Sequence, residues 1–176
     1  MNVRAFIITT VLLALMLTGC SEEISYDSNN TYSVINEIKE DAIVDGKPQY
    51  KEVYIFKDFE SYKKYYQDYY NIHSEIVVPD EIDFNNENLL VYNTVLNKSN
   101  KGVGYGIDKI IKRGNKIKIY LNADSYIKVN SEKNDKYYNN GRLVIVDKNT
   151  LSDDNEIIVI REEKNNIGVT VNYEVN

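Results

Sequence analysis

Two residue types that commonly carry out chemistry each occur once in this chain of 176 residues, as Cys20 and His73. A Ser-His-Asp or Cys-His arrangement needs a histidine held beside its nucleophile, and a zinc site needs several histidines or cysteines. His73 lies in a polar stretch, where a lone histidine is typically a solvated side chain. We therefore expect no catalytic residue, no metal and no cofactor.

Cys20 ends a segment with the layout of an export signal. Arg4 supplies a positive charge, residues 5–17 are apolar apart from two threonines, and residues 17–20, Leu-Thr-Gly-Cys, resemble the bacterial lipobox. The resemblance implies cleavage before Cys20 and transfer of a diacylglyceryl group to its sulfur, and two acyl chains anchor a protein stably. We expect residues 1–19 to be a lipoprotein signal peptide and the protein to be lipid-anchored at the extracytoplasmic face of the cell membrane.

Composition limits the other partners. The formal net charge is −6, and loss of Arg4 with the signal peptide makes it more negative. An acidic, exported protein is a poor nucleic-acid binder, so no nucleic-acid partner is expected. The chain also has 16 Tyr against 4 Phe and no Trp. Such tyrosines either form a stacking surface for sugars or peptides, or fill half-buried strands and the core.

The remaining chain divides into two parts. Residues 20–31 are polar and lack periodicity, which indicates a flexible tether. Residues 32–176 predict a single α+β domain: a mainly antiparallel sheet of about six to eight strands with one amphipathic helix packed on it. Asp58 is the expected N-cap of this helix over residues 59–70, where Phe59, Tyr62, Tyr66, Tyr69 and Tyr70 recur at helical spacing.

Polar stretches predict loops or turns. Residues 124–141 indicate a long loop with a short strand near Ile127 and Val129, and Glu163–Asn166 suits a hairpin between the last two strands. Carboxylate pairs for glycoside hydrolysis could come from residues 80–83 or 153–156. Both lie in acidic loops, where solvated charges are the usual outcome, so no catalytic pair is nominated.

The glycine-rich run Gly102-Val103-Gly104-Tyr105-Gly106 stands out. The next residues, 107–111, are strand-like, so no helix N-terminus is offered to a pyrophosphate. Because glycine weakens a strand, we expect a special corner with positive φ at one or more positions. Gly102, Gly104, Tyr105 and Gly106 are the candidate partner-binding residues, with Tyr105 as an aromatic anchor. The alternative is a structural bulge with Tyr105 packed inward.

A family resemblance rests on four features: Asp83-Phe84 before an apolar strand at 88–96, the corner Gly104-Tyr105-Gly106-Ile107, a hairpin, and a late apolar strand at 143–146. Over about residues 50–150 the chain resembles the C-terminal domain of PrcB-like protease-complex subunits. That family usually has Thr-Gly-Gly-Tyr where Gly102-Val103-Gly104-Tyr105 stands here. The resemblance implies a non-catalytic lipoprotein domain that assists or stabilises a protease assembly at the cell surface.

Three functions are therefore compared. The leading expectation is a lipid-anchored, non-catalytic accessory domain with a protein partner. The alternative is a glycan- or peptide-binding lipoprotein, which requires Tyr105, Tyr126, Tyr137 and Tyr138 to gather on an open concave surface. A hydrolase would require two carboxylates facing each other across a cleft.

The lipobox generates the first testable prediction. Replacing Cys20 with Ala removes the sulfur that accepts the lipid, so the protein should leave the membrane fraction or keep its signal peptide. Mass spectrometry of membrane-extracted wild-type protein should show a diacylglyceryl group on Cys20. An unmodified Cys20 thiol in that fraction would instead mean an incidental thiol behind an uncleaved anchor helix.

Overall fold

The computed structural model describes residues 21–24, 26, 32–71, 76–79, 82–96, 101–130, 136–152, 154–162 and 170–174. The expected signal peptide, Cys20 and His73 lie outside these residues, so the lipobox prediction is not tested by the structure. Within the described ranges, no helix is long and apolar enough to cross a membrane.

The described residues form a mainly β fold with a single α-helix, α2 (Phe59–Tyr69), as the sequence predicts. A 3-10 turn, η2 (Glu40–Ala42), is also present. The strands are β1 (Ser21–Ile24), β2 (Tyr32–Glu37), β3 (Ile43–Val44), β4 (Lys47–Pro48), β5 (Val53–Phe56), β6 (Glu87–Val95), β7 (Lys101–Arg113), β8 (Lys116–Asn130), β9 (Tyr138–Asp147), β10 (Glu156–Glu162) and β11 (Thr170–Glu174).

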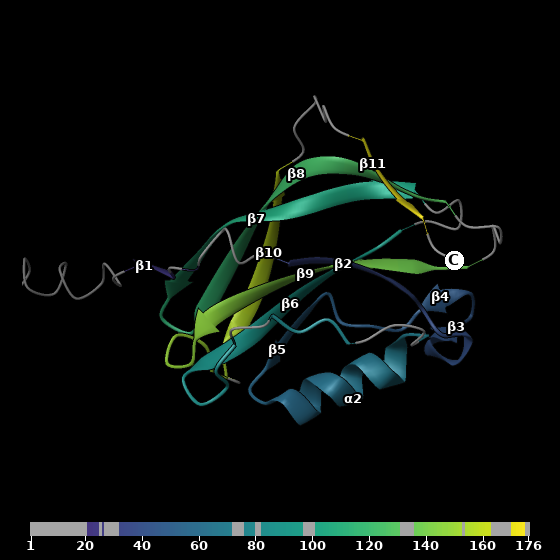
Figure 1. The fold of residues 1–176 in the computed structure, drawn as a ribbon. Helices are drawn as coiled ribbons and strands as arrows, with labels where there is room; N and C mark the ends of the chain where they lie inside the picture. Colours follow the sequence, from purple (N-terminus) through teal and green to yellow (C-terminus); the bar gives the residue numbers. More distant parts are fainter. Residues whose placement is uncertain are drawn as a thin grey trace, which may run out of the picture.

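The strands form two main sheets. Sheet A has the order β1-β7-β8-β10, with β11 also paired to β8, and sheet B has the order β2-β9-β6-β5. Strands β3 and β4 form a small separate pair. Figure 1 shows sheet A above sheet B and α2 below sheet B, so the described chain has three layers. Most pairings are antiparallel, but β10 and β11 run parallel to β8.

Sheet B has apolar side chains on both faces. Along β6, Leu90 and Tyr92 pack in the cluster shared with sheet A, whereas Leu89 and Val91 pack in the cluster shared with α2. All four are at most 2% exposed. The period of two along a strand places alternate residues on opposite faces, so β6 is buried on both sides. This explains why its sequence is a nearly continuous apolar run.

Helix α2 begins where the sequence predicts. The Asp58 carboxylate accepts a hydrogen bond from the backbone N–H of Ser61 at 2.7 Å, and this bond lowers the pKa of Asp58. Tyr62, Tyr65 and Tyr66 are its buried residues. The predicted aromatic stripe is thus partly wrong: it omitted Tyr65 and included Phe59, which is 40% exposed.

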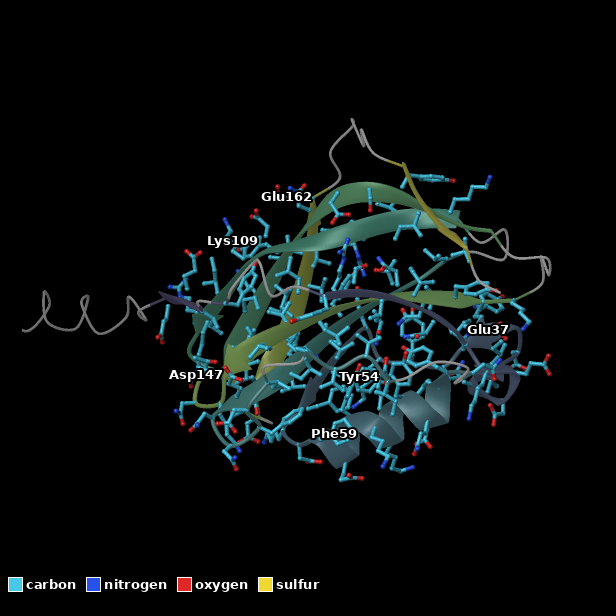
Figure 2. The ribbon with its side chains drawn as sticks, viewed as in Figure 1. Glu37, Tyr54, Phe59, Lys109, Asp147 and Glu162 are labelled. Atoms are coloured by element: carbon cyan, nitrogen blue, oxygen red, sulfur yellow. The ribbon has the colours of Figure 1, made fainter. Side chains whose placement is uncertain are left out.

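Tyrosine side chains fill the layer between α2 and sheet B. The ring centroids of Tyr54, which is labelled in Figure 2, and Tyr65 are 4.5 Å apart, and those of Phe56 and Tyr65 are 5.1 Å apart. The tyrosine excess of the sequence is therefore largely used in the core. Aromatic pairs of this kind contribute about 0.5–1.5 kcal/mol beyond the area that they bury.

Two buried tyrosine hydroxyls, those of Tyr65 and Tyr70, are bonded to asparagines of sheet B. The Tyr65 and Tyr70 hydroxyls lie 2.5 Å apart, and Tyr65 donates to Oδ1 of Asn93 at 3.1 Å. Asn139 donates from Nδ2 to both the Tyr70 hydroxyl and Oδ1 of Asn93. Hydrogen bonding is required here because a buried polar group without a partner costs about 1–3 kcal/mol. These four residues are called the Tyr-Asn network below.

The first part of the predicted tether is a strand. Ser21–Ile24 form β1, with Ser21 opposite Arg113 and Ile24 opposite Ile110 on β7. Ile24 is 2% exposed and belongs to the core between the sheets. The prediction of coil is therefore wrong for these four residues, because one buried isoleucine and a free strand edge suffice to order a polar segment. Most of the remaining predicted tether lies outside the described residues.

Two predictions about the C-terminal half are also wrong. Residues 124–130 continue β8, where only a short strand near Ile127 and Val129 was expected, and residues 138–141 begin β9, where a loop was expected. Asn139 suits a strand because its side-chain Nδ2 donates to the Tyr70 hydroxyl and to Asn93 within the Tyr-Asn network. The last two strands form no hairpin: β10 pairs with residues 116–122 of β8 and β11 with residues 126–130, both in parallel. The long β8 offers room for both strands in series.

The buried tyrosines generate a prediction about alkaline stability. Burial raises the pKa values of Tyr62, Tyr65 and Tyr70 far above their ordinary value of 10.0. Above pH 10 the unfolded chain releases tyrosine protons that the folded chain keeps, so stability falls as pH rises. Each such group lowers the free energy of unfolding by about 1.4 kcal/mol per pH unit, and the three together by roughly 4.

A folded domain is stable by only about 5–15 kcal/mol, so cooperative unfolding is expected within a few pH units above 10. Tyrosinate absorbance and circular dichroism should change together through this transition. Stepwise ionisation of all tyrosines with unchanged circular dichroism would contradict the burial.

Candidate functional site

The glycine-rich run lies inside β7, where the glycines make room for side chains. A Cβ at Gly102 would lie 2.7 Å from Leu96, and one at Gly104 would lie 2.3 Å from the Ser125 hydroxyl. A Cβ at Gly106 would lie 3.1 Å from the Asp124 carboxylate. The pairing of β7 with β8 shifts register between Gly104 and Tyr105: Gly104 is opposite Ser125 and Tyr105 is opposite Ala123, so Asp124 of β8 is the extra, bulged residue. The glycines therefore permit close packing around this bulge.

The expected positive φ is not found in the run. Gly46 and Gly114, in two tight turns, are the described glycines with positive φ. The prediction of a left-handed corner is wrong because β7 stays extended and paired with β8 through the whole run. The special feature is the bulge, and the missing side chains supply space rather than conformational freedom.

An ion pair between the sheets occupies that space. Arg142 of β9 donates from Nε to the Tyr105 carbonyl oxygen at 2.8 Å and from NH2 to Oδ2 of Asp124 at 2.7 Å. Its side chain is 15% exposed. Charge-assisted hydrogen bonds of a partly buried arginine are stronger than those of an exposed pair. Arg142 therefore links sheet B to the bulged part of sheet A.

Tyr105 is half-buried and packs against the core between the sheets. This position agrees better with the alternative that Tyr105 packs inward at a structural bulge than with an exposed aromatic anchor for a partner. Gly102 and Gly106 are likewise half-buried, and Gly104 is buried. A role of these four residues in partner binding stays a prediction, and the structure gives them a packing role in addition.

A separate hollow is lined by residues from both main sheets. It has a volume of about 330 Å³ and is lined by Tyr50, Glu52, Tyr92, Asn93, Thr94, Val95 and Arg161. Tyr92 and Thr94 belong to β6, Tyr50 and Glu52 precede β5, and Arg161 comes from β10. The hollow therefore draws on the interior strand β6 of sheet B and the edge strand β10 of sheet A, and Asn93 connects it to the Tyr-Asn network.

One lining residue, Val95, belongs to a stretch of β6 that β5 does not cover. Strand β5 pairs with β6 only as far as Tyr92, and the Glu52 carbonyl then accepts a hydrogen bond from the Asn93 N–H at 2.8 Å. The Leu96 N–H bonds to the Tyr138 carbonyl on the β9 side. Because ladder groups alternate in direction, the N–H and C=O of Val95 point away from β9, toward the uncovered edge.

The charged groups of the hollow are paired but accessible. Arg161 forms an ion pair with Glu52, and their side chains are 45% and 38% exposed. An ion pair at this exposure contributes at most about 1 kcal/mol, so either partner can exchange it for a ligand group. Arg161 also donates weakly to the Tyr92 hydroxyl at 3.4 Å. Burial raises the pKa of Tyr92 to about 12, so that hydroxyl stays protonated near neutral pH.

The hollow has the groups for binding and lacks a pair of acids. Glu52 is the one carboxylate among its lining residues, so the two-carboxylate arrangement for glycoside hydrolysis does not form there. Asp83 accepts hydrogen bonds from the Asn85 N–H and the Asn86 side chain, which lower its pKa and organise a turn. In the described ranges no three His, Cys, Asp or Glu side chains group to hold a metal.

The four tyrosines required for a concave stacking surface are not displayed together. Tyr126 is 39% exposed, whereas Tyr138 is 1% exposed. Tyr105 and Tyr137 are half-buried, and the Tyr137 hydroxyl donates to the Gly46 carbonyl. An open surface built from these four residues is therefore not what the fold provides.

Sequence reasoning did not identify the lining residues of the hollow. One signal was available: Arg161 continues the inward alternation of Ile157 and Val159 in a strand that was correctly expected. A charged residue at an inward position of a strand marks a place where the core opens or an ion pair forms. Tyr50 and Glu52 carried no comparable signal, because their position depends on where β5 ends.

Comparison with protein families, characterised proteins and solved structures found no match to this chain.

The packing around the bulge gives a stability prediction. Gly104→Ala places a Cβ against Ser125, Ile127 and Asp124, which must shift, and it should lower the free energy of unfolding by about 1–3 kcal/mol. Lys128→Ala, at an exposed position of β8, is the control and should change it by less than about 0.5 kcal/mol. Equal urea midpoints for both variants would contradict the packing role.

Proposed function

We propose that this protein is a lipid-anchored, non-catalytic binding domain of the extracytoplasmic face, and that it captures an extended segment of a protein partner in the hollow. The observation that carries the proposal is the uncovered edge of β6 at Val95, which forms part of the lining. A polypeptide in extended conformation can add to such an edge through main-chain hydrogen bonds, while side-chain pockets beside it provide specificity.

The other lining residues suit a peptide. Tyr50 is 37% exposed and offers an apolar ring with a polar tip, as interface tyrosines do. Arg161 can bind a carboxylate, and Glu52 can bind an amine or amide N–H, when their weak ion pair opens. The paired charges make the hollow nearly neutral, so recognition rests on hydrogen bonds and shape rather than on the acidity of the whole chain.

The resemblance to PrcB-like subunits is consistent with this proposal, since it also implies an accessory domain that engages a surface protein assembly. It remains a resemblance on a short motif. The alternative partner, a glycan, would stack on Tyr50 alone, because the tyrosines expected to form a larger platform are mostly buried.

The uncovered edge can be tested with one substitution. Val95→Pro removes the N–H that points toward the hollow and leaves the hydrogen bonds of β6 to β9 unchanged, because proline is tolerated at strand edges. Val95→Ala is the matched control, since it also shortens the side chain but keeps the N–H. A photo-reactive residue at Tyr50, compared with one at the equally exposed Tyr126, provides the measurement on intact cells.

We expect the photo-reactive residue at position 50 to cross-link to a peptide of one protein, and the one at position 126 to give no cross-link. The cross-link from position 50 should be abolished by Val95→Pro and retained by Val95→Ala. A cross-link that survives Val95→Pro would exclude strand addition. Cross-linking to a glycan, or to no molecule at position 50, would overturn the proposed protein partner.

A further inference from the structure

The chain enters the folded domain directly after the lipid-accepting cysteine. Cys20 precedes Ser21, so their Cα atoms are about 3.8 Å apart. Ser21 is the first residue of β1 and is opposite Arg113, at the end of β7. The distance between the acylated residue and the ordered sheet is thus a single peptide unit.

Strand β1 is held to the domain by more than its ladder. Ile24 is 2% exposed in the core between the sheets, together with Ile110. Two residues farther along the chain, the Tyr26 hydroxyl donates to the Ile107 carbonyl of β7 at 2.6 Å. These contacts fix the direction of β1, so its N-terminal end points past Arg113 toward the turn between β7 and β8.

That turn has side chains suited to phospholipid headgroups. Arg113 is exposed, and the planar guanidinium binds phosphate through two parallel hydrogen bonds. Lys116 is also exposed but pairs with Glu156 at 3.1 Å. A basic residue near an anionic membrane surface gains about 1 kcal/mol, so these cations orient the domain while the acyl chains provide the affinity.

We propose, on the basis of the lipid anchoring proposed above, that the domain is held against the bilayer without a flexible tether, with the β7–β8 turn from Arg113 to Lys116 at the headgroups. The occupant of this surface is the phospholipid membrane itself. Strand β10 begins beside the turn, at Glu156 opposite Lys116, and reaches Arg161 five residues later. The length of β10 between the turn and the hollow is therefore about 16 Å.

The orientation can be measured on the full lipidated chain in vesicles of phosphatidylcholine and phosphatidylglycerol with a headgroup-labelled energy acceptor. Cys20 is blocked by lipid, so a single donor can be attached at Asn115→Cys, in the turn, or at Lys128→Cys, about 40 Å of strand farther along β8. The expected result is several-fold stronger energy transfer from position 115. Equal transfer from both positions would overturn the proposal, because a flexible tether averages the two distances.

Two further variants complete the test. Ile24→Asp places a charge in the core contact of β1 and should release the strand, so the difference between the two positions should shrink. Arg113→Glu should weaken transfer from position 115 on vesicles that contain phosphatidylglycerol. If the unlabelled wild-type chain did not sediment with vesicles, the lipid anchoring would fail, and this inference with it. Sedimentation with equal transfer would overturn the orientation alone.

Discussion

The burial of sheet B on both faces is the constraint on which the other features depend. Strands β6 and β9 contact sheet A on one side and α2 on the other, so most of their side chains are removed from water. The Tyr-Asn network supplies hydrogen-bond partners to buried polar groups in the layer under α2: Tyr65 and Tyr70 enter this layer, and Asn93 and Asn139 bond to their hydroxyls. Each hydroxyl left without a partner would cost about 1–3 kcal/mol.

The same network specifies register. Asn93 and Asn139 belong to different strands and lie on the face toward α2 only in the observed pairing of β6 with β9. A slip of one residue would turn either side chain to the opposite face, away from the tyrosines. The register in turn sets what happens on the face toward sheet A, where Tyr92 is opposite Arg142. Tyr92 lines the hollow, and Arg142 binds Asp124, the bulged residue of β8.

The sequence was sufficient for the fold class and for the helix, because those depend on local patterns. Asp58 and the helical spacing of tyrosines predicted α2, and alternating apolar residues predicted most strands. It was insufficient where a polar side chain is satisfied by a distant partner. Asn139 was placed in a loop for this reason, since its partners Tyr70 and Asn93 are far away in the sequence. The hollow was missed because it depends on where one strand stops pairing with its neighbour.

The glycine-rich run illustrates the same limit in a different form. Three glycines in five residues correctly indicated an unusual place in the strand, but the pattern did not distinguish conformational freedom from missing volume. In the structure the glycines are needed because they leave room for neighbouring side chains: Gly104 and Gly106 face Ser125 and Asp124, and Asp124 binds Arg142. A glycine with extended φ in a paired strand is explained by its neighbours rather than by its own backbone.

Parallel pairing of β10 with β8 connects the two proposed surfaces. An antiparallel hairpin, as the sequence predicted for the last two strands, does not determine which end of the sheet β10 starts from. In the structure β10 starts at Glu156, beside the β7–β8 turn, and ends near Arg161 in the hollow. Seven consecutive pairs hold it to β8, so the spacing between the turn and the hollow is set by strand geometry. A coil tether would leave the height of the hollow above the bilayer variable, whereas a paired strand fixes it within the domain.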